Sequence, residues 1–240
     1  MTVSVHQPQY LPWLGYFHKI YYSDTFVFFD DVQYKKREYQ NRNRIRTKNG
    51  RMWLTVPVVK NEEPYPNISD VYIDNSQDWR SRHWRALYLN YGRAAFFKKY
   101  SDFFEDLYKK EYKRLTDLNI CIARHINSIL GIDKPIYLSS QLDIKTTGTQ
   151  HIIDVCKRLK ADTYLSGIGG KDYLEEDKFK AHSIKLVYQD FKHPIYTQLN
   201  MKDEKDFIPY LSVIDLIFNH GPKSVDIIGL HKIDTDYTDF

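Results

Sequence analysis

Residues 3–31 read VSVHQPQYLPWLGYFHKIYYSDTFVFFDD. Residues 3–5 alternate as a short strand does, and two prolines then hold the backbone open. Apolar side chains recur at helical spacing from Leu14 onward, and residues 25–29 form a continuous apolar run. Such a run is typical of a strand buried on both faces of a parallel sheet. The order of strand, turn, helix and strand predicts a β-α-β unit of about 30 residues.

Polar side chains follow both predicted strands of this unit. His6, Gln7 and Gln9 leave the first strand, and Asp30 and Asp31 leave the second. Ligands of open α/β sheets collect at the carboxyl ends of the strands, so we expect the two groups to lie near each other. A histidine or carboxylate in such a place can act as a general base. The alternative is that the prolines and the nearby tryptophan only pack the start of the first helix.

The remainder of the chain continues the α/β pattern. Lys48-Asn49-Gly50 is typical of a hairpin turn, and Gly131 is typical of a helix end. The later part alternates between short apolar runs and amphipathic stretches. The further elements predicted are strands at 52–59, 71–73, 136–140, 163–166 and 184–188, helices at 79–91, 149–160, 173–182 and 207–218, and one or two long helices over 94–129.

These elements together predict the fold class. We expect an α/β fold with a Rossmann-like, mostly parallel sheet, helices on both faces and a helical insertion in the middle of the chain. We expect residues 1–240 to form a single α/β domain, with the β-hairpin and helical insertion at about residues 45–130.

Composition limits the partners. The chain carries 35 basic and 31 acidic residues, and a net charge of +4 argues against duplex DNA as the main partner. It fits an anionic small substrate or transient RNA contact. No apolar run approaches the roughly 18 residues that span a bilayer, and the N-terminus lacks the pattern of a signal peptide. We therefore predict a cytoplasmic protein without membrane insertion, with its two cysteines reduced and no metal site.

A basic stripe follows the second predicted strand. The stripe begins after Asp30 and Asp31, and a carboxylate at a strand end can orient an amine or act as a general base. Adjacent side chains of an extended chain point in different directions, so at most one of the two carboxylates takes part. Arginines that alternate with asparagines offer bidentate contacts to phosphate, whereas a basic run is also typical of a solvated face. The candidate substrate-binding residues of this segment are Asp31, Arg37, Asn41, Arg42, Asn43 and Arg44.

Three later segments carry further candidates. Ser166-Gly167-Ile168-Gly169-Gly170 is a glycine-rich turn in which backbone N–H groups can approach a phosphate. The alternative is a short turn that needs glycines only for its own geometry. His193 follows a predicted strand, which suits general acid/base work, and a loop histidine bonded to the backbone is the alternative. The candidate binding residues beyond these are Tyr196, Gln198, Ser212 and Asp215.

Eight segments, in this order, resemble the WbqC-like family. They are HQPQYLPWLGYFHKI, DTFVFFDDVQYKKREYQNRNRI, WLTVPV, WRSRHWRALYLNY, YLSS, DVCKRLKADTYLSG, DFKHPIYTQ and LSVIDLIFNHG, and they cover nearly the whole chain from residue 3 to residue 221. The resemblance implies a bacterial protein from the biosynthesis of O-antigen and other surface polysaccharides that contain amino sugars.

A more distant similarity links the β-α-β start to HIGH-type nucleotidyltransferases and pantothenate synthetases. Those enzymes use two histidines to stabilise the phosphates of ATP. The comparable stretch here reads Tyr10-Leu11-Pro12-Trp13 and contains no histidine. A Rossmann-like fold is compatible with this difference, and transfer of AMP is not required.

The resemblance and the residues lead to three hypotheses. The first is transfer of an acyl or aminoacyl group to the amine of a nucleotide-linked amino sugar, with ATP plus an acid, acyl-CoA or aminoacyl-tRNA as donor. The second is a nucleotidyltransferase that acts on a nucleotide or sugar phosphate, and the third is a non-catalytic sugar-nucleotide or RNA-binding module. A homodimer is left open. In the first hypothesis the general base is His6, Asp30 or His193. The diphosphate of the sugar nucleotide is bound by Arg37, Arg42 and Arg44, and its nucleobase stacks on Tyr10 and Trp13.

Overall fold

The protein is described from a computed structural model, which covers residues 1–60 and 66–230. Five parallel strands form its central sheet in the order β5-β2-β1-β6-β7. The strands are β1 (Thr2–His6), β2 (Thr25–Phe28), β5 (Ile136–Leu138), β6 (Thr163–Ser166) and β7 (Lys185–Tyr188).

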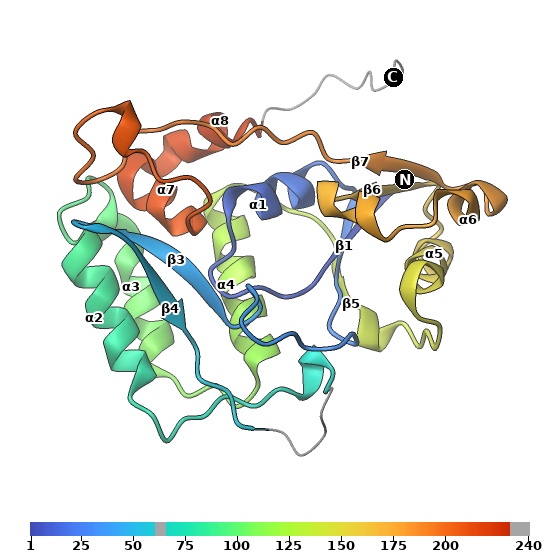
Figure 1. Cartoon of the computed structure of the whole chain (residues 1–240), viewed down its shortest axis with the longest axis horizontal. Coiled ribbons are helices and arrows are strands. Elements are labelled where there is room, and N and C mark those ends of the chain that lie inside the picture. The colour runs from blue at the N-terminus through green and yellow to red at the C-terminus, as the bar shows by residue number, and fades with distance from the viewer. Residues whose placement is uncertain (61–65, 231–240) are drawn as a thin grey trace.

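The order of the strands reverses once, between β1 and β6. The chain runs from β1 outward through β2 to β5, and then returns to place β6 on the other side of β1. Helices cover both faces of this sheet (Figure 1). The predicted Rossmann-like α/β class is therefore confirmed, and the reversal is the point at which such sheets bind ligands.

The strands divide their side chains between the two layers. Val3, Val5 and Val27 pack with α5 (Gly148–Arg158) and α6 (Glu176–Ala181). Phe26 and Phe28 face the opposite way, into a larger core. That core contains α1 (Leu14–Tyr21), α4 (Leu115–Ile129), α7 (Val213–His220) and α8 (Ser224–Ile228).

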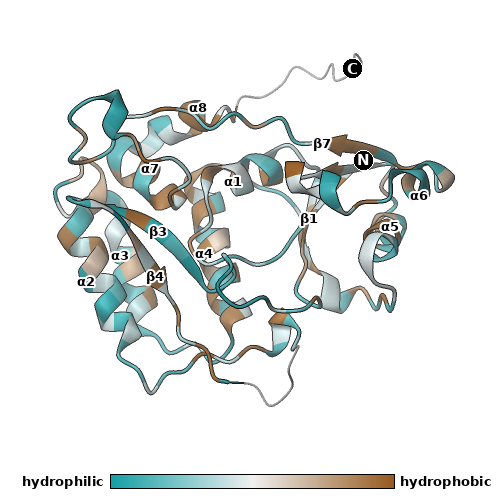
Figure 2. Cartoon of the chain, in the orientation of Figure 1, coloured by the Kyte–Doolittle hydropathy of each residue, from teal (hydrophilic) through white to brown (hydrophobic). Residues whose placement is uncertain are grey.

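A hairpin and three α-helices, the last of which is α4, lie between β2 and β5 in the chain. The hairpin consists of β3 (Arg42–Thr47) and β4 (Gly50–Thr55), so its second strand ends four residues before the predicted limit. The helices α2 (Trp79–Tyr91) and α3 (Phe97–Lys109) pack beside it, and Figure 2 shows them mixing hydrophilic and hydrophobic residues, as surface helices do.

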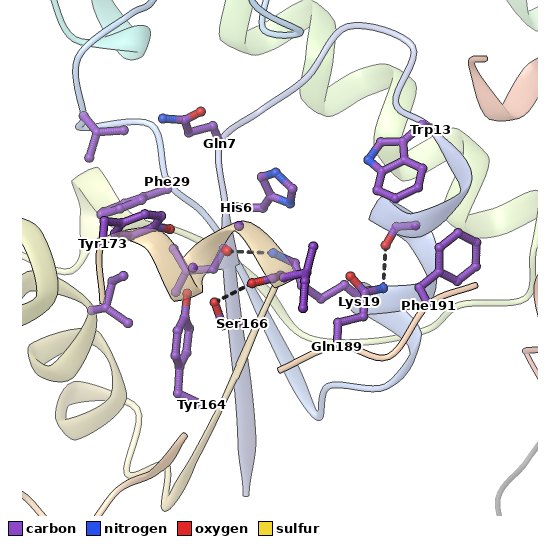
Figure 3. Close-up of a pocket in the computed structure, with 18 of the residues that line it drawn as sticks. His6, Gln7, Trp13, Lys19, Phe29, Tyr164, Ser166, Tyr173, Gln189 and Phe191 are labelled. Carbon is purple, nitrogen blue, oxygen red and sulfur yellow. Dashed lines mark hydrogen bonds between the residues drawn. The ribbon is translucent and has the colours of Figure 1, made fainter. Parts of the chain in front are cut away.

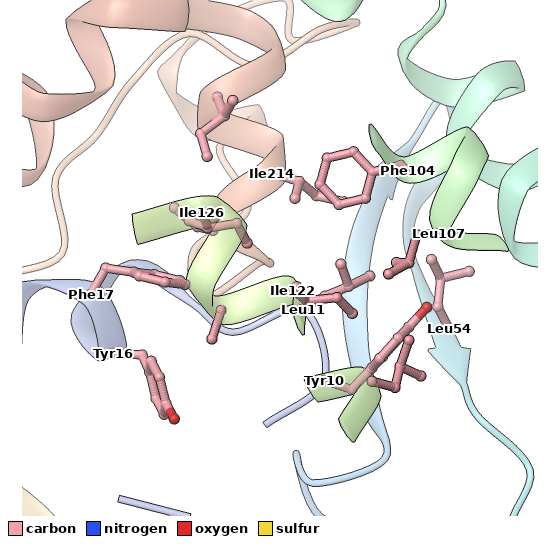
Figure 4. Close-up of a cluster of buried hydrophobic side chains, with 14 of the residues drawn as sticks. Tyr10, Leu11, Tyr16, Phe17, Leu54, Phe104, Leu107, Ile122, Ile126 and Ile214 are labelled. Atoms are coloured by element: carbon pink, nitrogen blue, oxygen red, sulfur yellow. The ribbon is translucent and has the colours of Figure 1, made fainter. Parts of the chain in front are cut away.

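The loop after β1 passes through the larger core. Tyr10 and Leu11 are fully buried against residues of the hairpin, α3, α4 and α7, such as Leu54, Phe104 and Ile122 (Figure 4). This contact ties the inserted hairpin and helices to the sheet.

The last predicted helix is shorter than expected at its start. Residues 207–212 form a loop, because Pro209 disfavours a helical conformation in the residue before it. Ser212 then caps α7 by accepting a hydrogen bond from the backbone N–H of Ile214 at 3.4 Å. The remaining short turns are 3-10 helices at Ile68–Asp70, Ser139–Gln141, Ile168–Asp172, Glu204–Asp206 and Gly221–Lys223.

None of the helices within residues 1–60 and 66–230 is long and apolar enough to cross a membrane.

Candidate functional site

A cavity of about 630 Å³ lies where the strand order reverses. His6 and Gln7 line it at the end of β1, and the glycine-rich turn lines it after β6. The start of α1 and the segment after β7 complete its walls. Figure 3 shows His6 and Lys19 between two pairs of aromatic rings. The cavity therefore occupies the place predicted for a ligand at the carboxyl ends of the strands.

His6 is the histidine of this cavity. Its Nε2 lies 3.3 Å from the side-chain amide of Gln9. Nδ1 is shielded from solvent and has no partner within the described residues. Burial, and next the positive charge of Lys19, lower the pKa of His6 well below 6.5. The imidazole is therefore neutral at pH 7, with one hydrogen-bonding atom unused.

Lys19 lies beside His6 on the buried side of α1. Its side chain is buried, and Nζ donates a hydrogen bond to the carbonyl oxygen of Val5 at 3.1 Å. Burial lowers the pKa of Lys19 to about 7. The cavity thus contains a lysine that gains or loses its charge near neutral pH.

The glycine-rich turn forms the wall at the end of β6. Ser166 is buried, and its Oγ donates to the carbonyl oxygen of Gly167 at 3.0 Å. A Cβ on Gly170 would lie 2.1 Å from that Oγ, so this position needs glycine. Gly169 has open space around it. The turn thus presents backbone to the cavity with little side-chain cover.

Aromatic rings form two opposite sides of the cavity. Trp13 and Phe191 meet edge to face with 5.5 Å between ring centres, and Phe29 and Tyr173 stand on the other side (Figure 3). The indole of Trp13 lies over Gly15, where a Cβ would come within 2.3 Å of it. Rings in this arrangement can stack on a nucleobase or pack against a sugar.

Asp30 lies outside the cavity lining, although it directly follows β2. Its carboxylate accepts hydrogen bonds from Ser139 Oγ at 3.1 Å and from the N–H and Oγ of Ser140 at 3.0 and 2.7 Å. It is 2% exposed. These contacts use both oxygens to hold the turn after β5, so we do not retain Asp30 as the base. Its neighbour Asp31 accepts from Ser139 Oγ and lies 3.5 Å from His151 Nε2.

His193 also lies outside the cavity lining. Its Nδ1 bonds to the carbonyl oxygen of Pro194 at 2.9 Å, and its Nε2 accepts from the N–H of Tyr210 at 3.1 Å. Its ring stacks 6.4 Å from the ring of Trp13. Both nitrogens are occupied, so the structure favours the alternative of a loop histidine bonded to the backbone.

The candidates near the C-terminal helix α7 form a separate buried cluster. The Asp215 cluster, as we name it, consists of Asp215, Tyr91, Tyr196, Gln198 and Arg46. Tyr91, Tyr196 and Gln198 donate to the carboxylate of Asp215 at 2.8, 2.9 and 2.9 Å. Arg46 donates to Gln198 Oε1 at 2.8 Å. These bonds join the hairpin to the C-terminal segment, so the cluster stabilises the fold and does not line the cavity.

Three further candidates have structural roles. Tyr10, which was predicted to stack on a nucleobase, is 0% exposed, and its hydroxyl contacts His83 Nδ1 at 2.8 Å and the hydroxyl of Tyr108. Asn41 and Asn43 donate to the backbone carbonyls of Val56 and Leu11 at 2.8 and 2.6 Å. None of these three lines the cavity.

The arginines of the basic stripe surround an exposed tryptophan on the hairpin. The guanidinium carbons of Arg42 and Arg44 lie 4.3 and 5.3 Å from the ring centre of Trp53. Arg42 donates to the backbone of Arg37, and Arg44 donates to the carbonyl oxygen of Tyr210 at 3.1 Å. These three arginines do not line the cavity, whereas Lys35 of the same stripe does.

Several cavity residues were not selected from the sequence. Lys19 was hidden within an amphipathic helix, and its signal was a lysine next to the core positions Phe17 and Ile20. Gln189 and Phe191 precede His193 in the segment after β7, and from the sequence His193 is the residue of this segment that suits acid/base chemistry. Gln189 Nε2 donates to the carbonyl oxygen of Gly15 at 2.9 Å and so closes the cavity against α1.

The chain is similar to known proteins over nearly its whole length. The model of the WbqC-like protein family matches residues 7–227. A protein of Mycobacterium tuberculosis, named Uncharacterized protein Rv1507c, is 35% identical over 228 residues, which are 94% of this chain and 96% of that protein. No solved structure matches the chain.

Proposed function

The chain belongs to the WbqC-like protein family, and from this premise we propose that it transfers an acyl or aminoacyl group to the amine of a nucleotide-linked amino sugar. The proposed site is the cavity between the ends of β1 and β6. The observation that carries the proposal is a half-buried, neutral His6 with an unused, solvent-shielded Nδ1 inside that cavity.

The chemistry of amide formation needs such a base. The amine of an amino sugar is protonated at neutral pH, and an ammonium group has no lone pair for attack on an acyl carbon. After the ammonium has lost one proton to solvent, the amine can attack, and a neutral imidazole can accept the second proton as the N–C bond forms and the bond from the acyl carbon to the leaving group breaks. His6 returns the proton to the leaving group or to water, so the ring ends the cycle unchanged.

The shape and lining of the cavity support a sugar nucleotide as acceptor. A volume of about 630 Å³ lies within the range of small-molecule sites. Trp13 and Phe191 offer ring faces and edges for a base or sugar, and the glycine-rich turn offers backbone. Gln7 lies at the same end, where its Oε1 accepts from Gln40 Nε2 at 3.0 Å.

A mass-spectrometric screen of the purified protein tests this proposal. Nucleotide-linked amino sugars are combined in parallel with ATP plus amino acids, with acyl-CoAs and with charged tRNA. We expect a mass gain on the sugar with one class of donor. Release of pyrophosphate from a nucleoside triphosphate and a sugar phosphate would instead favour a nucleotidyltransferase, and binding without any product would favour a binding module.

A further inference from the structure

Lys19 is a buried lysine without a carboxylate partner. Its side chain is 3% exposed, and no ion pair within residues 1–60 and 66–230 includes it. An ammonium group has three hydrogens to donate, and the carbonyl oxygen of Val5 accepts one of them at 3.1 Å. Buried charges in proteins are normally paired, so an anionic ligand beside Nζ would complete this site.

The position of Nζ indicates where that anion would lie. Val5 is in β1, and a Cβ on Gly167 would be 3.9 Å from Nζ. The ammonium group therefore sits at the reversal of strand order, between the end of β1 and the glycine-rich turn. Figure 3 shows the Lys19 side chain reaching this place from α1, next to His6.

We propose that Lys19 binds the diphosphate of the sugar nucleotide and takes up a proton as it does so. This inference rests on the proposed function, because it assumes a nucleotide-linked ligand in the cavity. The diphosphate is thereby assigned to Lys19 in place of Arg37, Arg42 and Arg44, none of which lines the cavity. The guanidinium groups of Arg42 and Arg44 lie against Trp53.

Proton uptake follows from the surroundings of Lys19. Burial lowers its pKa to about 7, so about half of the molecules carry a neutral amine at pH 7. A phosphate beside Nζ favours the ammonium form, and the bound complex then holds more protons than the free protein. The titratable groups on the surrounding elements are Tyr16, His6, Lys35, Tyr164, Tyr173 and Asp190.

Calorimetry on the full chain tests the uptake directly. The probes are UDP-, dTDP- and GDP-linked sugars, whose diphosphates do not titrate near pH 7. Each is titrated in two buffers of different ionisation enthalpy. We expect uptake of about half a proton for each ligand bound at pH 7, and little uptake at pH 5.5, where Lys19 is already charged. Absence of uptake at pH 7, or of binding by every probe, would overturn the proposal.

Two variants separate Lys19 from other sources of protons. Lys19→Arg keeps a charge that does not titrate, so it should bind the probe without the uptake. Lys19→Met should bind on the order of tenfold more weakly, whereas the exposed control Lys36→Met should bind as the native protein does. Native affinity in Lys19→Met would contradict the proposal, and the uptake measurement on the native chain decides the question if a variant does not fold.

The outcomes distinguish this inference from the proposed reaction. Binding with proton uptake but no amide product would contradict the transfer reaction and leave the role of Lys19 intact. Amide formation by Lys19→Met at the native KM would contradict the role of Lys19 alone.

Discussion

Two of the polar clusters within the described part of the protein differ in how their atoms are partnered. The Asp215 cluster satisfies both oxygens of its carboxylate with three donors at 2.8 to 2.9 Å. In the cavity, Nδ1 of His6 has no partner among the described residues, and Lys19 has one acceptor for three hydrogens. Polar residues within apolar sequence therefore mark either a structural network or a site, and the unsatisfied atoms around a cavity distinguish them.

The largest effect is expected for the base. We expect His6→Gln to lower kcat by about 10²- to 10⁴-fold, because the general base is lost while a polar side chain remains. His193→Gln is the matched control and should keep kcat within a few-fold. Steady-state kinetics with the donor and acceptor found in the screen provides the measurement. Equal losses in both variants would remove the distinction between the two histidines.

The pH profile sharpens the same prediction. Because burial keeps the pKa of His6 well below 6.5, the ring stays neutral as the pH falls through 6.5. The acid limb of kcat should therefore lie below pH 6.5. An acid limb at or above pH 6.5 would mean that His6 is not the base.

The next effect concerns stability at the other cluster. We expect Asp215→Ala to lower the free energy of unfolding by about 3 kcal/mol, since the donors Tyr91, Tyr196 and Gln198 would stay buried without their acceptor. Urea unfolding measures this, with the exposed Asp177→Ala as control. Protein that remains folded should bind the sugar nucleotide with native affinity. A stable Asp215→Ala with lost binding would place the cluster in the site.

A smaller effect is expected at the glycine-rich turn. A Cβ on Gly170 would meet Ser166 Oγ at 2.1 Å and Leu174 at 2.9 Å, so Gly170→Ala should lower stability by about 1–3 kcal/mol. Gly169→Ala has open space and should leave the thermal midpoint unchanged. Similar midpoints for both variants would show that the turn can relax.

The smallest effect is expected on the hairpin. Arg44→Ala should change the affinity for a sugar nucleotide by less than about twofold, because the guanidinium contacts Trp53 and the backbone of Tyr210 outside the cavity. Calorimetry measures this beside Lys19→Met. A loss in Arg44→Ala as large as that in Lys19→Met would return the diphosphate to the basic stripe.

The sequence was sufficient for the class of fold, because the runs at residues 3–5 and 25–29 and the later alternation report burial directly. It placed ligand candidates at the carboxyl ends of the strands, but it grouped the end of β1 with that of β2 and treated the glycine-rich turn after β6 as a separate candidate. It could not separate His6 from Asp30, since both follow buried strands. That difference depends on Ser139 and Ser140, which lie far along the chain and reach Asp30 only in the folded sheet.

Lys19 illustrates the opposite failure. A lysine in an amphipathic helix normally faces water, and its place next to Phe17 and Ile20 does not show that this one turns toward the end of β1. Only the packing of α1 against the sheet makes it a cavity residue. The hydrogen-bond and ion-pair partners of a side chain, unlike its residue type, depend on contacts between distant segments of the chain.

A crystal structure of the protein soaked with a nucleotide-linked amino sugar tests the central claim most directly. We predict the diphosphate within hydrogen-bonding distance of Lys19 Nζ, beside the glycine-rich turn, with the sugar amine directed toward His6. A ligand bound at Arg42 and Arg44 on the hairpin, with the cavity between β1 and β6 left empty, would contradict the account.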